Sequence, residues 1–117
     1  MYMGYNMYQT ITRYIKTTNN QEQVLFRSEE ITNKDKFLKA VFMVNETNTD
    51  GVVATCLIRN PNEDDYYMFP KTQKMKAGDS VSAIQKTLIL NDDDVIIFKS
   101  SVAGVECSLI IDYDPQS

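Results

Sequence analysis

Residues 95–113 read VIIFKSSVAGVECSLIIDY, two apolar stretches joined by a short turn. In the second stretch, Val105–Tyr113, apolar residues alternate with other residues, which is typical of a strand with one buried face. Ala103-Gly104 provides a turn between this strand and the strand expected at Val95–Ser100. No window of the chain carries apolar residues at helical spacing over three turns, so this region predicts β-structure.

The same alternation recurs along the rest of the chain, between turn signals such as Asp50-Gly51. Val and Ile together outnumber Leu and Ala by 19 to 11, and 117 residues are enough for one domain. The sequence therefore predicts an all-β fold, a single antiparallel jelly-roll-like sandwich of about eight strands over residues 9–117. Besides the two strands above, we expect strands at Gln9–Thr17, Glu22–Arg27, Lys36–Asn45, Val52–Arg59, Tyr66–Phe69 and Ser80–Leu90.

The alternation also predicts which residues point inward and how the strands connect. Val24 and Phe26 should share one face of their strand. The loop NETNTDG (45–51) should behave like a hairpin loop, and Lys71–Asp79 should be a polar loop. The core should include Phe42, Leu57, Leu88 and Ile110.

Charge and hydropathy argue against nucleic acid and membrane as partners. The chain has 12 Lys and Arg against 16 Asp and Glu, a net charge of −4 and a pI near 4.7. The basic residues are scattered, whereas a nucleic-acid binder normally presents a basic face, so we expect neither nucleic-acid binding nor a polybasic membrane contact. The first residues lack the pattern of a secretory signal, and no apolar run is long enough to span a bilayer.

The residue types also argue against catalysis. The chain has no histidine, which removes the Ser-His and Cys-His arrangements and the commonest zinc ligand. Cys56 and Cys107 both lie in alternating apolar runs, so we expect two buried, reduced thiols, with a disulfide between neighbouring strands as the alternative. The sequence predicts no enzyme and no cofactor.

Two acidic turns, Asn62–Asp65 and Asn91–Asp94, are the candidates for cation binding or for paired catalytic carboxylates. Neither follows the spacing of a calcium loop, and we expect solvated turns, with Asn91–Asp94 closing a hairpin. The two turns would hold an ion only if they lay side by side, which the sequence does not decide. No metal site is assigned.

Aromatic residues are the strongest functional signal. The first eight residues, MYMGYNMY, are uncharged and do not alternate like a strand, so we treat 1–8 as an N-terminal arm. Such an arm either folds back over its own sandwich or anchors on a neighbouring chain, and we favour the second. The aromatic run Tyr66-Tyr67-Met68-Phe69 must likewise leave one face exposed. The candidate interface residues are Tyr2, Tyr5, Tyr8, Tyr66, Tyr67 and Phe69.

The order of segments over residues 36–113 resembles small all-β virion proteins of tailed bacteriophages. The resemblance rests on order and spacing. The matching segments are Phe42–Asn45, Val52–Asn60, Tyr66–Phe69, Ala77-Gly78-Asp79-Ser80, Thr87–Leu90, Asp92–Val95 and Ile96–Ser101.

The resemblance implies a non-enzymatic head, neck or tail component, such as a capsid decoration protein, that acts through contacts with other virion proteins and with itself as a homo-oligomer. Its location would be the virion, after synthesis in the host cytoplasm. Two alternatives remain: a small carbohydrate-binding module, in which Tyr66, Tyr67 or Phe69 would contact a glycan, and a monomeric accessory domain that binds another protein.

Overall fold

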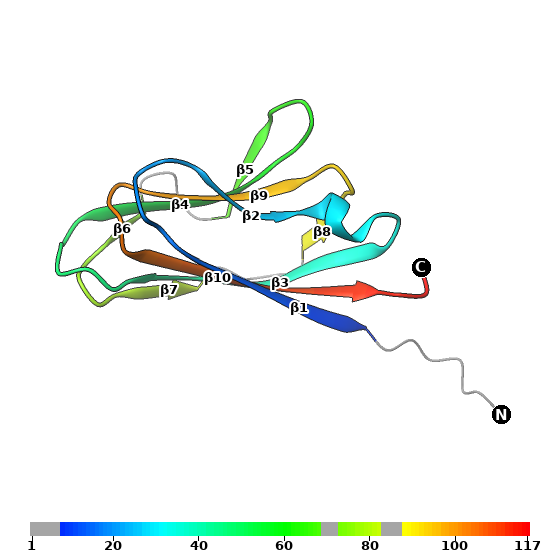
Figure 1. Cartoon of the computed structure of the whole chain (residues 1–117), viewed down its shortest axis with the longest axis horizontal. Helices are drawn as coiled ribbons and strands as arrows, with labels where there is room; N and C mark the ends of the chain where they lie inside the picture. Colours follow the sequence, from blue (N-terminus) through cyan, green and yellow to red (C-terminus); the bar gives the residue numbers. More distant parts are fainter. Residues whose placement is uncertain (1–7, 69–72, 83–87) are drawn as a thin grey trace.

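In the described part of the chain, ten strands form two antiparallel sheets that pack face to face (Figure 1). The computed structural model describes residues 8–68, 73–82 and 88–117. The strands are β1 (Gln9–Lys16), β2 (Gln23–Arg27), β3 (Asp35–Asn45), β4 (Val52–Arg59), β5 (Asp65–Tyr67), β6 (Lys74–Met75), β7 (Ser80–Ser82), β8 (Leu88–Leu90), β9 (Val95–Ser100) and β10 (Val105–Asp114).

The order of strands is that of a jelly roll. One sheet runs β1-β10-β3, with β7 and β8 both pairing with β3, and the other runs β2-β9-β4, with β5 and β6 both pairing with β4. The ten strands therefore occupy eight positions. The antiparallel β-sandwich expected from the sequence is confirmed, and the strand expected at Ser80–Leu90 is seen as β7 and β8, with residues 83–87 outside the described part of the chain.

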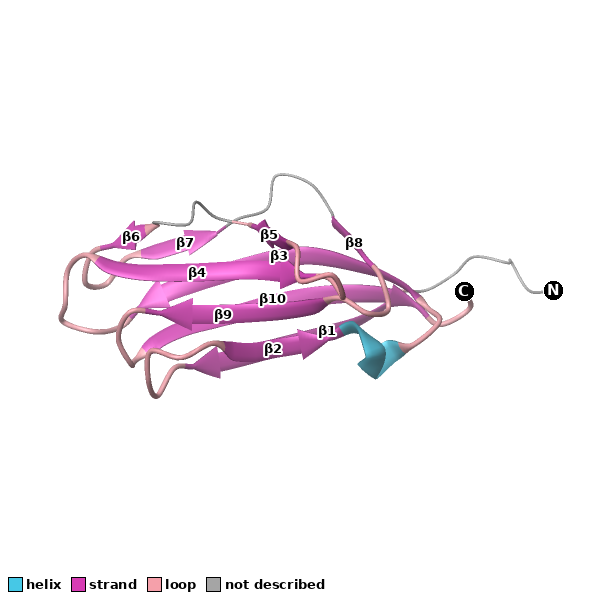
Figure 2. Ribbon diagram, turned by 90° about the horizontal axis from the view of Figure 1, so that it is seen from above, coloured by secondary structure: helices cyan, strands magenta, loops and turns pink. Residues whose placement is uncertain are grey.

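Most connections pass from one sheet to the other instead of closing hairpins (Figure 2). The loop 46–51 joins β3 to β4 across the sandwich, and the turn 91–94 joins β8 to β9 in the same way. The hairpin expected at each of these turns is therefore wrong, because turn residues reverse the chain without specifying which strand it pairs with next. Residues 60–64 do close a hairpin, between β4 and β5.

The core lies between the two sheets and is filled by one face of each strand. Phe98 of β9 and Leu109 of β10 have no exposed surface. The segment Lys71–Asp79 departs from the polar loop expected, because within it Lys74–Met75 pairs with β4 as β6 and Met75 is buried in the core. A single apolar residue in a polar stretch carries no period that could reveal so short a strand.

A β-bulge in β3 explains why Phe42 was wrongly expected in the core. Ala40 pairs with Ile110 and Leu38 with Ile111, so Lys39 is the extra residue. Leu38 and Val41 consequently both point inward, and Phe42 points outward with 42% of its surface exposed. Ile110 also lies on the outer side, half-buried, so its assignment to the core is wrong.

The other two expected core residues fare differently. Leu57 is buried, as predicted, whereas Leu88 is only partly buried and packs against the edge of the core.

A second bulge, in β2, corrects the expectation that Val24 and Phe26 share one face. Val24 pairs with Ile97 and Phe26 with Ile96, which leaves Leu25 as the extra residue. Leu25 and Phe26 are both buried, and Val24 is 44% exposed. Val24 and Phe26 therefore do not share a face, because the inserted residue reverses the alternation between them.

The two cysteines lie in opposite sheets, Cys56 in β4 and Cys107 in β10. Both are fully buried and neither forms a disulfide, which confirms the expected pair of buried thiols. The neighbouring Cys56 thiol and burial raise the pKa of Cys107, so the Cys107 thiol stays protonated in the core.

The one described helix is a single 3-10 turn, η1 (Ser28–Ile31), between β2 and β3. It was not expected from the sequence, because one turn is too short to show helical spacing. The side chain of Glu30 accepts a hydrogen bond from the backbone amide of Arg27 at 3.2 Å and another from Arg13 Nη2 at 2.7 Å. Within the described residues, the structure contains no helix of sufficient length and apolarity to cross a membrane.

Candidate functional site

The structure places three of the six predicted interface residues. Tyr8 and Tyr66 are exposed, at 54% and 53%, and Tyr67 is half-buried. The remaining three predicted residues, Tyr2, Tyr5 and Phe69, lie outside the described residues.

Tyr8 packs against the outer surface of the β1-β10-β3 sheet. Its ring meets that of Phe37 edge to face, with 5.7 Å between ring centroids and an interplanar angle of 74°. This geometry is favourable for two aromatic rings beyond the area that it buries. The last residue of the arm therefore contacts a surface of the sandwich before β1 begins at Gln9.

The outer side of this sheet carries a band of apolar side chains, which we call the outer apolar face. The register places them in rows: Tyr14 and Phe42 both pair with Ser108, and Ile89 pairs with Phe37. Tyr14 is 60% exposed and Ile89 is 72% exposed. The members of the outer apolar face are Tyr8, Tyr14, Phe37, Phe42, Ile89 and Ile110.

Sequence reasoning missed most of this face. It assigned Phe42 and Ile110 to the core. Both lie in near-continuous apolar stretches, where the odd-numbered and the even-numbered residues of the strand would each form an apolar face. The N-terminal arm was the one sequence feature that indicated this face, since an uncharged, aromatic terminus predicts a nearby apolar surface.

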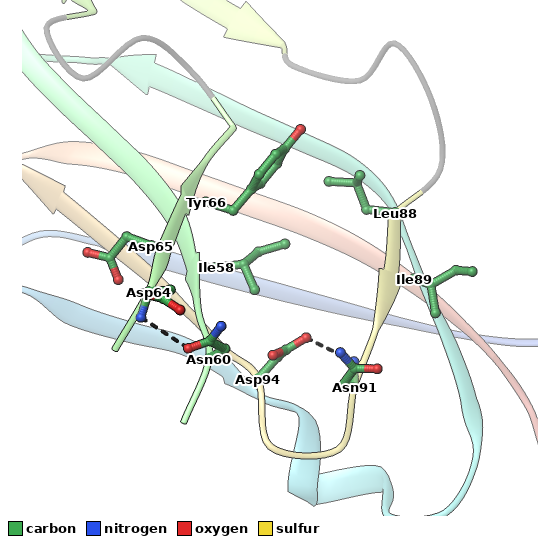
Figure 3. Close-up of a pocket in the computed structure, with 9 residues that line it drawn as sticks. All are labelled: Ile58, Asn60, Asp64, Asp65, Tyr66, Leu88, Ile89, Asn91 and Asp94. Atoms are coloured by element: carbon green, nitrogen blue, oxygen red, sulfur yellow. Dashed lines mark hydrogen bonds between the residues drawn. The ribbon is translucent and has the colours of Figure 1, made fainter. Parts of the chain in front are cut away.

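A pocket of about 300 Å³ opens at the side of the sandwich, between β4 and β5 of one sheet and β8 of the other (Figure 3). It brings the two acidic turns together: Asp64 lies on one side and Asp94 on the other. The sequence did not decide whether these turns meet. The described lining consists of Ile58, Asn60, Asp64, Asp65, Tyr66, Leu88, Ile89, Asn91 and Asp94.

Local hydrogen bonds hold both turns in place. The side-chain oxygen of Asn60 accepts from the backbone amides of Asn62 at 2.9 Å and Asp64 at 3.0 Å. On the other side, Oδ2 of the buried Asp94 accepts from the backbone amide of Asn91 at 2.9 Å. The Asp94 carboxylate and the backbone of Asp64 are therefore held by hydrogen bonds within their own turns.

Asp65 belongs to an ion-pair network that extends away from the pocket. Arg59 Nε donates to Asp65 at 2.8 Å, and the Arg59 guanidinium also bonds both carboxylate oxygens of Glu22, at 3.0 and 3.1 Å. The hydrogen bonds from Arg59 lower the pKa of Glu22. Asp65 is therefore neutralised by its neighbour, unlike Asp64, whose carboxylate forms no ion pair with any described residue.

The acidic residues do not form a metal site in the described part of the chain, where no three His, Cys, Asp or Glu side chains are grouped to hold an ion. The turn Asn91–Asp94 is also not simply solvated. Asp92 forms an ion pair with Lys36, a fully buried lysine of β3, and accepts the backbone amide of Asn33 at 3.0 Å. Lys36 Nζ also donates to the carbonyl of Ile31 at 2.7 Å.

We expect acid to destabilise the protein. The hydrogen bond from Lys36 and that from the Asn33 amide lower the pKa of Asp92. As the pH falls below about 4, the unfolded chain takes up a proton at Asp92 first, so the free energy of unfolding falls with the pH through this window. Arg13 lowers the pKa of Glu30 in the same way, which adds to the effect.

Urea denaturation between about pH 6 and pH 3 measures this dependence. Asp92→Asn should flatten it, whereas Asp93→Asn, which removes the neighbouring exposed carboxylate, should leave the slope of the wild-type protein. A urea midpoint that stays constant down to pH 3 would contradict the assigned role of the ion pair.

No protein-family model matches the chain, and no curated protein matches it either.

Proposed function

We propose that this protein is a non-enzymatic structural component of a tailed-phage virion, a capsid decoration, neck or tail protein that acts through contacts between subunits. The observation that carries the proposal is the outer apolar face, with Tyr14 and Ile89 more than half exposed. The jelly-roll order of strands supports it, since viral capsid domains commonly have this architecture. The segment order shared with phage virion proteins supports it further.

The outer apolar face has the composition of an interface. Aromatic residues are enriched in the buried centre of protein interfaces, and each such ring buries about 150–250 Å². Ser108 lies between Tyr14 and Phe42 in the register, so this row is apolar with a small polar gap. Charged residues flank the row on both sides, with Lys16 and Glu106 toward one end of the face and Asp112, between Thr10 and Phe37, toward the other. An apolar surface of this kind marks a contact site on a soluble protein.

The partner that we propose for this face is a second copy of the chain, contacting it through the N-terminal arm. The arm adds two tyrosines and three methionines before Tyr8 and carries no charged side chain. Tyr8 already lies against Phe37 on this face, so the arm leaves β1 beside the surface that it would cover. Exchange of such arms between neighbours gives a homo-oligomer with the same contact repeated at each subunit.

Deleting residues 1–8 should weaken self-association by about tenfold or more and leave the sandwich folded, because the strands begin at Gln9. Sedimentation of the full-length and shortened proteins at matched concentrations measures association, and circular dichroism checks folding. Unchanged association of a folded, shortened protein would refute the role of the arm. Loss of the fold would show that the arm packs within its own sandwich.

A pair of surface variants separates the outer apolar face from exposed apolar residues in general. Phe42→Ser should weaken association, whereas Val24→Ser, at an equally exposed position of the other sheet, should not. Equal effects of the two changes would contradict the proposed face.

A further inference from the structure

We propose that the pocket beside β5 and β8 binds a lysine or arginine side chain presented by a protein partner. This inference does not rest on the proposed function. Ile89 is the one described residue that the pocket shares with the outer apolar face, and self-association does not require this binding event. It follows from the pairing of apolar walls with uncompensated acidic groups in one pocket.

Apolar side chains form the wall of the pocket that would contact the stem of such a residue. Ile58 extends from β4 toward the strand that carries Leu88, and the ring of Tyr66 stands beside them (Figure 3). A volume of about 300 Å³ lies at the small end of the range for ligand pockets, which suits one long side chain. Lys and Arg both bury an aliphatic stem along apolar surface and keep their charge at the tip.

Acidic and amide groups form the opposite end. Asp94 lies between Asn60 and Asn91, with 94% of its surface buried, and Asp64 comes from the facing turn (Figure 3). The described lining includes no Lys or Arg, and Arg59 is already shared between Asp65 and Glu22. No described Lys or Arg therefore pairs with the carboxylates of Asp64 and Asp94, and a cationic tip would balance them through hydrogen bonds that the charge strengthens.

Tyr66 distinguishes this occupant from a simple inorganic cation. Tyr66 is 53% exposed and lines the pocket, where its ring can receive a guanidinium or ammonium group over its face. A bare metal ion would need several oxygen ligands at once, and the described residues do not group three acidic or sulfur ligands anywhere. The combination of ring, apolar wall and carboxylates matches an amphipathic cation.

The test uses N-acetyl-arginine amide as the probe and N-acetyl-citrulline amide as its neutral isostere. Titration of each into the ¹⁵N-labelled full-length protein should shift the backbone amides of Ile58, Tyr66 and Asn91 with the arginine probe. The citrulline probe should bind at least about tenfold more weakly, because it lacks the charge. Binding of the arginine probe should also weaken as the salt concentration rises from about 0.05 M to 0.5 M.

Two variants with the same change of charge locate the site. Asp94→Asn should weaken binding of the arginine probe at least about fivefold, whereas Asp93→Asn, one residue away, exposed and outside the lining, should change it less than twofold. Asp64→Asn checks independently whether the acidic end of the pocket binds the arginine probe, and it should also weaken that binding. Asp64 lies on an exposed turn, where the fold does not depend on its carboxylate.

Three results would overturn the proposal. The first is equal binding of the arginine and citrulline probes, and the second is the absence of shifts with either. The third is binding of a neutral oligosaccharide such as maltotriose at these residues without binding of the arginine probe, which would assign the pocket to a glycan instead.

Discussion

Phe98→Ala is expected to lower the free energy of unfolding by about 3–5 kcal/mol, the cost of removing a fully buried aromatic ring and leaving a cavity. Phe98 lies in β9, the strand between β2 and β4, where it has no exposed surface. The core around it belongs to both sheets, so little of the cavity should collapse. The melting temperature should fall by roughly 10–20 °C.

Phe42→Ala provides the matched control, with the same atoms removed from the outer side of β3. Because Phe42 is 42% exposed, we expect less than half the loss seen at Phe98. Urea denaturation of the two variants at one pH gives the comparison. Equal losses would mean that the bulge at Lys39 is misplaced and that Phe42 belongs to the core.

Asp92→Asn is expected to cause the second large loss of stability. Lys36 is fully buried, and Asp92 is its ion-pair partner across the sandwich end. Removal of the carboxylate leaves a desolvated ammonium group whose remaining acceptors are the backbone carbonyls of Ile31 and Lys34. Removing the partner of a buried charge is destabilising for this reason.

The double variant Lys36→Met/Asp92→Asn distinguishes an unpaired charge from general damage to the turn. Methionine fills a similar volume without the charge, so it should restore much of the stability that Asp92→Asn loses. Thermal denaturation of the two single variants and the double variant at neutral pH measures the coupling. If the double variant were less stable than Asp92→Asn, the loss of stability in Asp92→Asn would not come from the unpaired Lys36 ammonium group.

The strands themselves could be predicted because apolar residues alternate with other residues along them in the sequence. The bounds of Val52–Arg59 and Val95–Ser100 agree with expectation residue for residue. The buried face could not be predicted in β2 and β3. A bulge at Leu25 or Lys39 reverses which residues point inward, and in both strands each of the two faces carries apolar residues. Lys36 was also missed, because a charged residue at a strand end ordinarily faces water.

Part of the candidate site could be predicted from the sequence. Tyr66 and both acidic turns were identified from residue type, but their meeting in one pocket depends on β5 and β8 approaching from different sheets. Alternation within a strand carries no information about such an approach. Asp92 shows the same limit, because a partner more than fifty residues away decides whether an acidic turn is solvated or paired.

The position of β10 has a consequence for how the chain acquires its fold. β10 is synthesised after the other nine described strands, yet it lies between β1 and β3, so that Gln9 pairs with Tyr113. The strand that pairs with β1 is therefore made about ninety residues after it, so β1 has no partner in its sheet until β10 has been synthesised. Pairing at such sequence separation makes folding slow, in the range of milliseconds to seconds. During that interval the exposed edges of β1 and β3 are the segments that a chaperone or a neighbouring nascent chain would meet first.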